Sequence, residues 1–295
     1  VQTSVGNIND RPTGSDATLG AIDEANLDPV GATVDDLFST GYSDGVDDQS
    51  AIQGGGDSAT ALGGVALVGN NATSDQGTWQ YRTDDGTNWT SVATDVSDSD
   101  ATTLANDADT RLRFVPANGD YNSDVGGPNG LDVRLADSAP SNATGQDISD
   151  DLGNTSTWSD TQALNTSVDP VNDAPAADPS QNFTLNEDDG TQTTSQFMDT
   201  IKPDANVENS VTAEDSQTVS FDIDGITDQA GGQNYTVAEL FDTAPEFTDS
   251  AGTDNELTFT PSDILADGEI QTVEVAVNIT DDGGTPNGGD DSAEE

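Results

Sequence analysis

Apolar residues in this chain alternate with polar ones in short runs, which is the pattern of half-buried β-strands. The longest run covers residues 273–279, and shorter ones cover residues 219–224, 131–135 and 112–114. Residues 77–89 have the pattern of a β-hairpin with Asp85-Gly86 as its turn. A short helix is expected only around residues 237–241. Many short strands separated by Asp, Gly, Asn and Pro predict an all-β protein built from β-sandwiches.

The chain also repeats itself. Residues 1–12 (VQTSVGNINDRP) align without gaps with residues 164–175 (LNTSVDPVNDAP), an offset of 164 − 1 = 163 residues, and this offset also places Glu24 on Glu187. Further on, Phe-Val-Pro at 114–116 matches Phe-Thr-Pro at 259–261, and Leu-Ala-Asp at 135–137 matches Ile-Thr-Asp at 279–281. Two homologous domains of unequal length are therefore predicted.

The repeat predicts the domain boundaries. Residues 1–12 are interpreted as an orphan terminal strand and linker of a preceding domain, or of a neighbouring subunit's domain. Residues 13–171 form the larger tandem β-sandwich and residues 172–295 the second one. In the first domain, 164 − 137 = 27 residues separate Asp137 from the last strand, whereas 295 − 281 = 14 residues follow Asp281. The second domain is therefore expected to lack its own last strand.

The charge of the chain changes the functional picture. Six Lys and Arg face 57 Asp and Glu, a formal net charge of −51, and the chain has no Cys and no His. This charge disfavours nucleic acid and anionic membrane surfaces as partners, and no segment is apolar enough to insert into a membrane. Disulfides, thiol nucleophiles and imidazole bases are excluded. Two compatible explanations remain for the excess of acidic residues. One is an adaptation to high salt, where repulsion within the chain is screened, and the other is that carboxylates hold Ca²⁺.

Three motifs together carry a resemblance to a known group of proteins: the Asn172-Asp-Ala-Pro175 junction, the Asn186-Glu-Asp-Asp-Gly190 segment and the hairpin at residues 77–89. They resemble the tandem Ig/cadherin-like repeats of giant microbial surface adhesins, although this chain is more acidic than expected for that group. The resemblance implies an extracellular or cell-surface stalk of stacked β-sandwiches, whose joints are often stiffened by calcium.

Calcium at a domain joint needs oxygen ligands from the linker, from the start of the next domain and from its acidic loops. The Asp222-Ile-Asp224 pair also places two carboxylates on one side of a strand. Solvated surface acid is the competing interpretation. The candidate ligands are Asp10, Glu24, Asp137, Asp173, Glu187, Asp222, Asp224, Asp281 and Asp282.

The chain contains more Asn-X-Ser/Thr sequons than its composition predicts, and chance remains an alternative explanation for them. The candidate glycosylation sites are Asn71, Asn88, Asn142, Asn154, Asn165, Asn182, Asn234 and Asn278.

Three classes of function stay open: a structural or adhesive segment of a surface fibre, a carbohydrate- or protein-binding module, and a carboxylate hydrolase. Trp79, Tyr81 and Trp89 are a candidate sugar platform, but such aromatic residues are more often core anchors of a hairpin. Paired carboxylates alone do not indicate hydrolysis in so acidic a chain. We therefore expect a non-catalytic protein whose partners are copies of itself or neighbouring repeats, end to end, with surface glycans or proteins as further candidates.

The orphan strand predicts how these units connect. It is expected to complete a sandwich other than its nearest one, either in a covalent array or by head-to-tail donation in a filament. The candidate donor residues are Val1, Gln2, Thr3, Ser4 and Val5.

Overall fold

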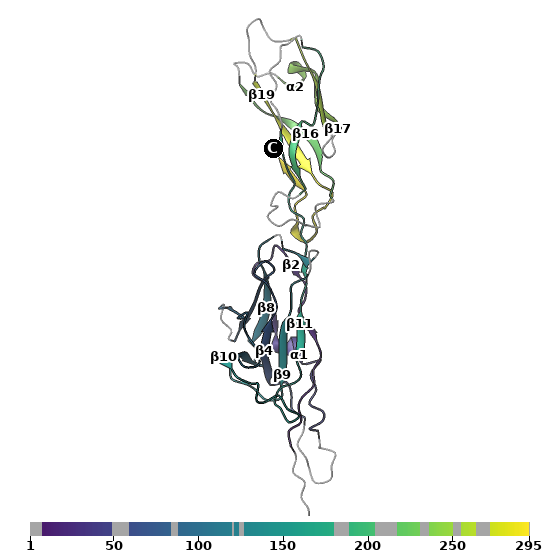
Figure 1. Cartoon of the computed structure of the whole chain (residues 1–295). Helices are drawn as coiled ribbons and strands as arrows, with labels where there is room; N and C mark the ends of the chain where they lie inside the picture. Colours follow the sequence, from purple (N-terminus) through teal and green to yellow (C-terminus); the bar gives the residue numbers. More distant parts are fainter. Residues whose placement is uncertain are drawn as a thin grey trace, which may run out of the picture. The chain divides into compact units, whose positions relative to one another are not determined.

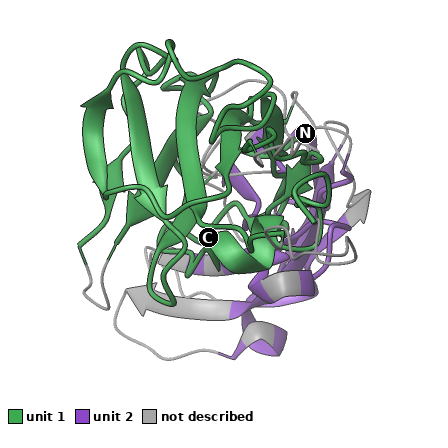
Figure 2. Cartoon of the chain, turned by 90° about the horizontal axis from the view of Figure 1, so that it is seen from below, with its two compact units in different colours: residues 1–170 green, residues 171–295 purple. Residues whose placement is uncertain are grey.

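The computed structural model describes residues 8–48, 59–83, 88–119, 121–123, 127–179, 189–203, 217–230, 236–249, 255–263 and 272–294. The chain divides into two compact units, unit 1 (Val1–Pro170) and unit 2 (Val171–Glu295), which are coloured separately in Figure 2. Strands dominate both units, and the α-helices in the described residues are short (Figure 1). The prediction of an all-β fold is confirmed.

The described residues of unit 1 form one short α-helix and a series of strands. They are β1 (Ala17–Thr18), β2 (Ile22–Asp23), β3 (Ala32–Thr33), α1 (Val34–Phe38), β4 (Gly64–Asn70), β5 (Gly77–Arg82), β6 (Thr90–Ser91), β7 (Ala101–Ala105), β8 (Arg111–Pro116), β9 (Leu131–Ala136), β10 (Ala143–Gln146), β11 (Gln162–Asn165) and β12 (Val168–Asp169).

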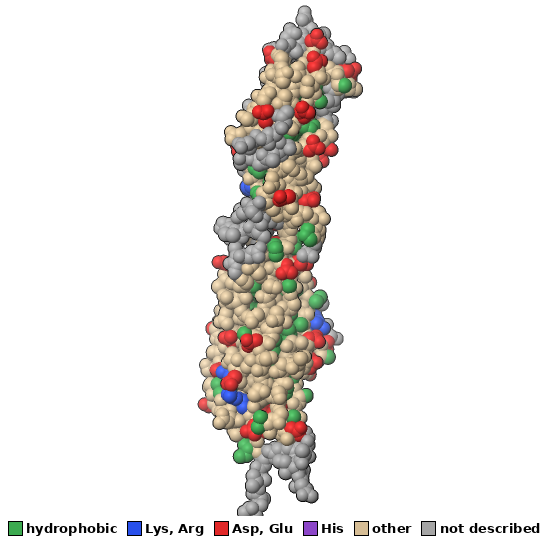
Figure 3. All heavy atoms as spheres, turned by 90° about the vertical axis from the view of Figure 1, so that its right-hand side faces the viewer, with side chains coloured by type: hydrophobic (Ala, Val, Ile, Leu, Met, Phe, Trp, Pro, Cys, Tyr) green, Lys and Arg blue, Asp and Glu red, His purple; other side chains and the backbone are tan. Residues whose placement is uncertain are grey.

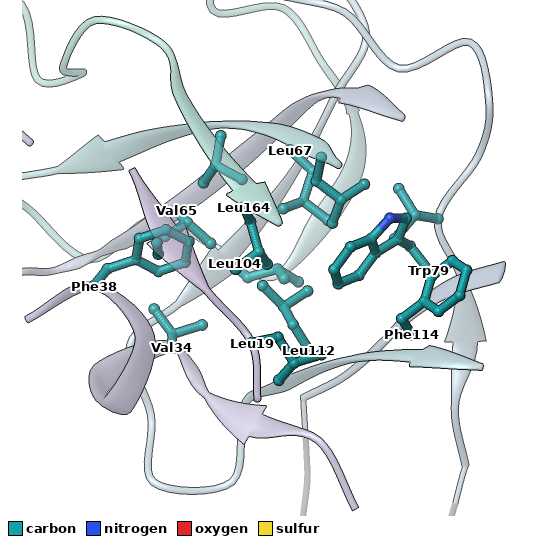
Figure 4. Packing of buried hydrophobic residues seen from close by; sticks show 14 of the residues in the cluster. Leu19, Val34, Phe38, Val65, Leu67, Trp79, Leu104, Leu112, Phe114 and Leu164 are labelled. Carbon is teal, nitrogen blue, oxygen red and sulfur yellow. The ribbon is translucent and has the colours of Figure 1, made fainter. Parts of the chain in front are cut away.

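Two sheets of unit 1 share one hydrophobic core. The larger sheet has the order β1-β11-β9-β4-β7-β10 and the smaller one has the order β3-β8-β5-β6. Trp79 of β5 is fully buried and its ring packs edge-on against Phe114 of β8, with 5.3 Å between the ring centroids. Figure 4 shows these two rings beside leucines of the larger sheet, Leu67 and Leu104 among them. In β5, β8 and β9 the alternating pattern is satisfied, because every second side chain faces this core.

A second, smaller cluster covers the outer face of the larger sheet. It combines alanines of β4, β7 and β9 with Ile148 and Trp158 from the segment that follows β10. Arg134 of β9 anchors the same face, because its guanidinium pairs with both carboxylate oxygens of Asp98 at 2.7 and 2.9 Å. The longer sequence between Asp137 and β11 in unit 1 therefore serves to cover a face of its own sheet.

In the described residues of unit 2 the strands form three smaller sheets, β13-β15, β14-β18-β17 and β16-β19-β20. Phe221 and Ile279 face each other across β16 and β19, and both are buried in the core of the unit. Its elements are β13 (Ala176–Pro179), β14 (Gln192–Ser195), β15 (Met198–Lys202), β16 (Ser220–Ala230), α2 (Val237–Leu240), β17 (Phe241–Asp249), β18 (Glu256–Pro261), β19 (Thr272–Thr280), η3 (Pro286–Gly288) and β20 (Ser292–Glu294).

Most of the expected elements are present, and the structure adds strands that were not predicted individually, the central strand β4 among them. The expected strands correspond to β8, β9, β16 and β19, the hairpin to the antiparallel pair β5 and β6, and the short helix to α2. The predicted Asp85-Gly86 turn lies outside the described residues. Helix α1 was missed because it has only five residues, although Thr33 caps it by accepting a hydrogen bond from Asp36 N. Strand β20, which pairs with the end of β19, was also not predicted.

Candidate functional site

The asparagine of the first Asn-Asp motif is held by its own domain. The side-chain amide of Asn9 donates a hydrogen bond to Asp137 Oδ2 at 2.9 Å and another to the carbonyl of Ser156 at 3.3 Å. The backbone N–H of the next residue, Asp10, donates to Asp47 Oδ1 at 2.9 Å. The motif is therefore fixed to two separate carboxylates of unit 1.

The asparagine of the second motif is held in the same way by unit 2. The side-chain amide of Asn172 donates to the carboxylate of Asp281, at 3.0 and 3.3 Å from its two oxygens, and to the carbonyl of Asp290 at 2.7 Å. Its side-chain oxygen accepts a hydrogen bond of 2.6 Å from Gln217 Nε2. Asn172 is buried.

The two arrangements share their donor contacts, one to a carboxylate and one to a backbone carbonyl. Each accepting carboxylate directly follows one of the matched strands, β9 or β19. In unit 1 the accepting carbonyl is that of Ser156, two residues before Trp158, which pairs with the last residue of β9. In unit 2 it is that of Asp290, two residues before Ser292, which pairs with the last residue of β19. The 163-residue repeat in sequence is thus accompanied by a repeated three-way contact between the motif, a strand end and the segment that returns to it.

Three buried carboxylates lie near the first motif in unit 1. Asp44, Asp47 and Asp137 are 4%, 5% and 9% exposed. Asp44 Oδ2 accepts two hydrogen bonds of 2.8 Å from the N–H and the hydroxyl of Thr60, but its Oδ1 is buried and accepts none. In the part of the chain that the structure describes, none of the three forms an ion pair with Lys or Arg.

Burial and the charges of these carboxylates raise the pKa of two groups beside them, Asp137 and Tyr42. Burial raises the pKa of Asp137, hydrogen bonds from Asn9 and Ser138 oppose this shift, and the charges of Asp44 and Asp47 add to it. Burial also raises the pKa of Tyr42 to about 12; the hydrogen bond to Thr60 acts in the opposite direction, and the charges of all three carboxylates contribute to the rise. Buried like charges without a counter-ion destabilise one another, so a cation would stabilise this group.

The structure places the other predicted calcium ligands in several different surroundings. Glu24 is buried next to β2, at the end of unit 1 where the label β2 stands in Figure 1, and accepts a hydrogen bond of 2.9 Å from Asn122. Its backbone N–H donates to the carbonyl of Asp169. The contacts of Glu24 therefore differ from those of Asp10 and Asp137, with which it was predicted to share a site.

In unit 2, Asp281 accepts hydrogen bonds from Asn172 and from the N–H of Gly283. Asp282 is exposed, and its Oδ1 accepts a hydrogen bond of 2.8 Å from the N–H of Thr218. Asp173 is half-buried, and Asp222 and Asp224 of β16 are exposed. Glu187 lies outside the described residues. In the described ranges, no group of three or more acidic side chains is arranged to hold a metal ion as it stands.

Asp44 and Asp47 were not among the ligands predicted from the sequence. With 57 acidic residues, the loop Asp44-Gly-Val-Asp47 has nothing in its composition that separates it from surface acid. The acidic side chains spread over the face in Figure 3 illustrate this background. Burial of the carboxylates is what distinguishes this loop from surface acidic residues, and burial is a property of the folded chain.

The candidate glycosylation sites are mostly at the surface. Asn278 of β19 is half-buried, and Asn182 and Asn234 lie outside the described residues. Asn142 has a structural role as well, because its side-chain oxygen accepts a hydrogen bond of 2.7 Å from the N–H of Ala105. The exposed candidates are Asn71, Asn88, Asn142, Asn154 and Asn165.

The three aromatic residues do not form an open platform. Trp79 is fully buried and its indole N–H donates to the carbonyl of Asn129 at 3.0 Å, and Tyr81 is half-buried. The ring of Trp89 is contacted by two guanidinium groups, Arg113 at 4.1 Å and Arg82 at 5.1 Å from its centroid. These contacts fit the interpretation of the aromatic residues as anchors of the hairpin.

The predicted donor residues Val1–Val5 lie outside the described residues. No helix in the described part of the chain combines the length and apolarity needed to cross a bilayer. Comparison with known protein families, with curated proteins and with solved structures finds no match to this chain.

Proposed function

We propose that this chain is a non-catalytic, structural or adhesive segment of an extracellular surface fibre, built from tandem Ig- or cadherin-like β-sandwiches. The observation that carries the proposal is the repeated contact of Asn9 with Asp137 and of Asn172 with Asp281. A short linker that docks on its own domain in each repeat limits rotation about the joint, which is a requirement for a stiff stalk.

We also propose that the carboxylates near the first motif bind Ca²⁺. Asp44, Asp47 and Asp137 supply buried anionic oxygen, the ligand type that Ca²⁺ prefers, and Asp44 Oδ1 has no other partner. Bound Ca²⁺ would supply positive charge that offsets the repulsion between the three carboxylates. These side chains must rotate toward a common point on binding, because in the described residues no three acidic groups converge on one.

The net charge of −51 supports a role for dissolved salt beside specific binding. Repulsion between surface carboxylates is screened over a Debye length of about 3 Å in 1 M salt and about 10 Å in 0.1 M salt. High monovalent salt should therefore stabilise both units, whereas Ca²⁺ at low concentration should act on unit 1 through the buried group. This difference separates general screening from binding.

The test is calorimetric melting of the full chain with Ca²⁺ and with a chelator, at fixed high monovalent salt. We expect Ca²⁺ to raise the melting temperature of unit 1. Asp44→Asn should remove most of this shift and, with chelator present, should itself stabilise unit 1, because it removes one of three repelling charges. Asp109→Asn, an exposed position in the same unit, is the matched control and should keep the shift.

A melting temperature that does not respond to Ca²⁺ would refute the calcium proposal. An equal response in Asp44→Asn and in the native chain would place the site elsewhere. The structural role is tested separately by electron microscopy of the natural parent protein on its source cells, with antibodies against unit 1. Label confined to the cell interior would contradict it.

A further inference from the structure

The outer face of the smaller sheet of unit 1 gathers half of the basic residues of this chain. The chain has six Lys and Arg against 57 Asp and Glu. Three of the six lie on this one face, Arg82 of β5 and Arg111 and Arg113 of β8. They point away from the core, because their strand neighbours Tyr81 and Leu112 pack into it. In so acidic a chain, this face stands out as cationic.

The register of the sheet places these residues in rows across the strands. Arg82 stands directly opposite Arg111, and Thr33 of β3 lies on the far side of Arg111. Trp89, which directly precedes β6, continues the row beyond Arg82, with its ring centroid 5.1 Å from the guanidinium carbon. Neighbouring strands lie about 4.8 Å apart, so such a row is about 14 Å long.

Two like charges directly opposite each other destabilise a sheet. Arg111 donates a hydrogen bond of 3.3 Å to the carbonyl of Gly31, and within the described residues it forms no ion pair with Asp or Glu. Arg113 differs, because it is buried and pairs with Asp28 at 2.5 Å. An anion placed over Arg82 and Arg111 would therefore offset their repulsion, whereas Arg113 has a structural role.

The chemistry of the face indicates the kind of anion. Guanidinium groups bind carboxylates through a planar fork of N–H donors. Contacts of this kind persist in 1 M salt, where attraction beyond about 3 Å is screened. In the next row of the same face, Gln80 pairs with Ser91, and both side chains can exchange hydrogen bonds with hydroxyl groups. Carboxylate-binding and hydroxyl-binding groups along parallel rows suit a linear polymer of acidic sugars.

The surroundings of the row favour a thin polymer over a protein surface. Asp28 is exposed beside Arg113, and Asp35 and Asp36 are exposed where α1 follows Thr33. A protein interface of standard size covers about 800 Å² on each partner. An acidic protein surface of that extent would meet these carboxylates as well as the arginines, whereas a single polysaccharide strand can follow the row alone.

We propose that the outer face of β5 and β8 binds a uronate-bearing polysaccharide, whose carboxylates are held by Arg82 and Arg111. Trp89 keeps the Arg82 guanidinium in place through its ring face. Gln80 and Ser91 bind sugar hydroxyls in the next row. The inference rests on the proposed function, because it names the class of ligand to which an adhesive segment would attach.

The test is calorimetric titration of the full chain with short oligogalacturonates, in high monovalent salt with Ca²⁺. We expect saturable binding that Arg111→Gln weakens by about tenfold or more, the effect of losing one charge-assisted hydrogen bond. Arg82→Gln should weaken it similarly. Arg11→Gln, which removes an arginine of the same unit that pairs with Asp160, is the matched control and should bind like the native chain. The melting temperature of each variant verifies that unit 1 is folded.

Three other polymers identify the class of ligand. Neutral dextran should not bind, and polyglutamate and dextran sulfate should bind at least about tenfold more weakly than oligogalacturonate of equal charge. Polyglutamate that binds as tightly would indicate an acidic protein partner, and dextran sulfate that binds as tightly would indicate a sulfated one. Either result would overturn the inference, as would binding that Arg111→Gln and Arg82→Gln leave unchanged. Absence of binding with the calcium response of unit 1 intact would refute this inference and leave the proposed function standing.

Discussion

Replacement of Asn172 by alanine tests the contact on which the joint of unit 2 depends. The change removes hydrogen bonds to a carboxylate and to a carbonyl, and leaves Gln217 Nε2 without its partner. A hydrogen bond to a charged group contributes about 1.5–3 kcal/mol and a neutral one about 0.5–1.5 kcal/mol. Partial relaxation of the loop reduces the sum, so we expect unit 2 to lose about 3 kcal/mol of unfolding free energy.

The surrounding loop gives little room for compensation. A Cβ on Gly283 would clash with Asn172 Oδ1, and one on Gly289 would lie 2.8 Å from the Asn172 carbonyl oxygen. Both glycines therefore permit the backbone to wrap around Asn172, and an alanine at position 172 leaves a cavity that this backbone cannot close without moving. The buried position makes water an inadequate substitute for the lost partners.

Differential scanning calorimetry of the full chain in high salt is the appropriate assay, because the two units should melt as separate transitions. For a unit of this size, about 3 kcal/mol corresponds to a fall of roughly 10 °C in melting temperature. The transition of unit 1 should not move. Asn9→Ala, the equivalent change in unit 1, should cost only about 1 kcal/mol, because Asn9 is exposed and makes two hydrogen bonds.

Exposed Asn88→Ala is the control for loss of an asparagine as such. If Asn172→Ala lowers the melting temperature of unit 2 no more than this control does, the three-way contact is not what stabilises the joint. A fall in both transitions would show instead that the units unfold as one cooperative body.

Three further outcomes are expected for unit 1. Arg134→Gln should destabilise it by about 2 kcal/mol, because it breaks a largely buried ion pair with Asp98. Arg11→Gln breaks a more exposed pair and should change the unfolding free energy by no more than about 0.5 kcal/mol. Equal effects of the two changes in urea unfolding would contradict the expectation that the buried pair contributes more. Trp158→Ala should cost about 3 kcal/mol because it empties the small outer cluster, and a neutral result would show that this face needs no cover. Asn142→Gln should destabilise unglycosylated protein by about 1 kcal/mol, because it disturbs the hydrogen bond that Asn142 accepts from the N–H of Ala105. An effect seen only in glycosylated protein would refute this expectation.

Much of the fold could be predicted from sequence because it depends on local alternation. Leu131, Val133 and Leu135 are all fully buried, as a period of two requires when one face of a strand meets the core. The Asn-Asp motifs were also found by sequence alone, since a gap-free repeat needs no knowledge of contacts. The same reasoning assigned Trp79 and Tyr81 more readily to a hairpin core than to a ligand platform.

Which of the many acidic residues belong together depends on the folded chain. Asp44 and Asp47 come from a loop with no distinguishing pattern, and burial beside Asp137 depends on segments about ninety residues apart in the chain. Glu24 matched Glu187 at the repeat offset, but only the fold shows that its carboxylate accepts a hydrogen bond from Asn122 and its backbone N–H donates to Asp169, whereas Asp137 accepts one from Asn9. Periodicity and repeats are properties of neighbouring residues, whereas the electrostatic cost of a carboxylate is set by everything the fold packs around it, which no local pattern encodes.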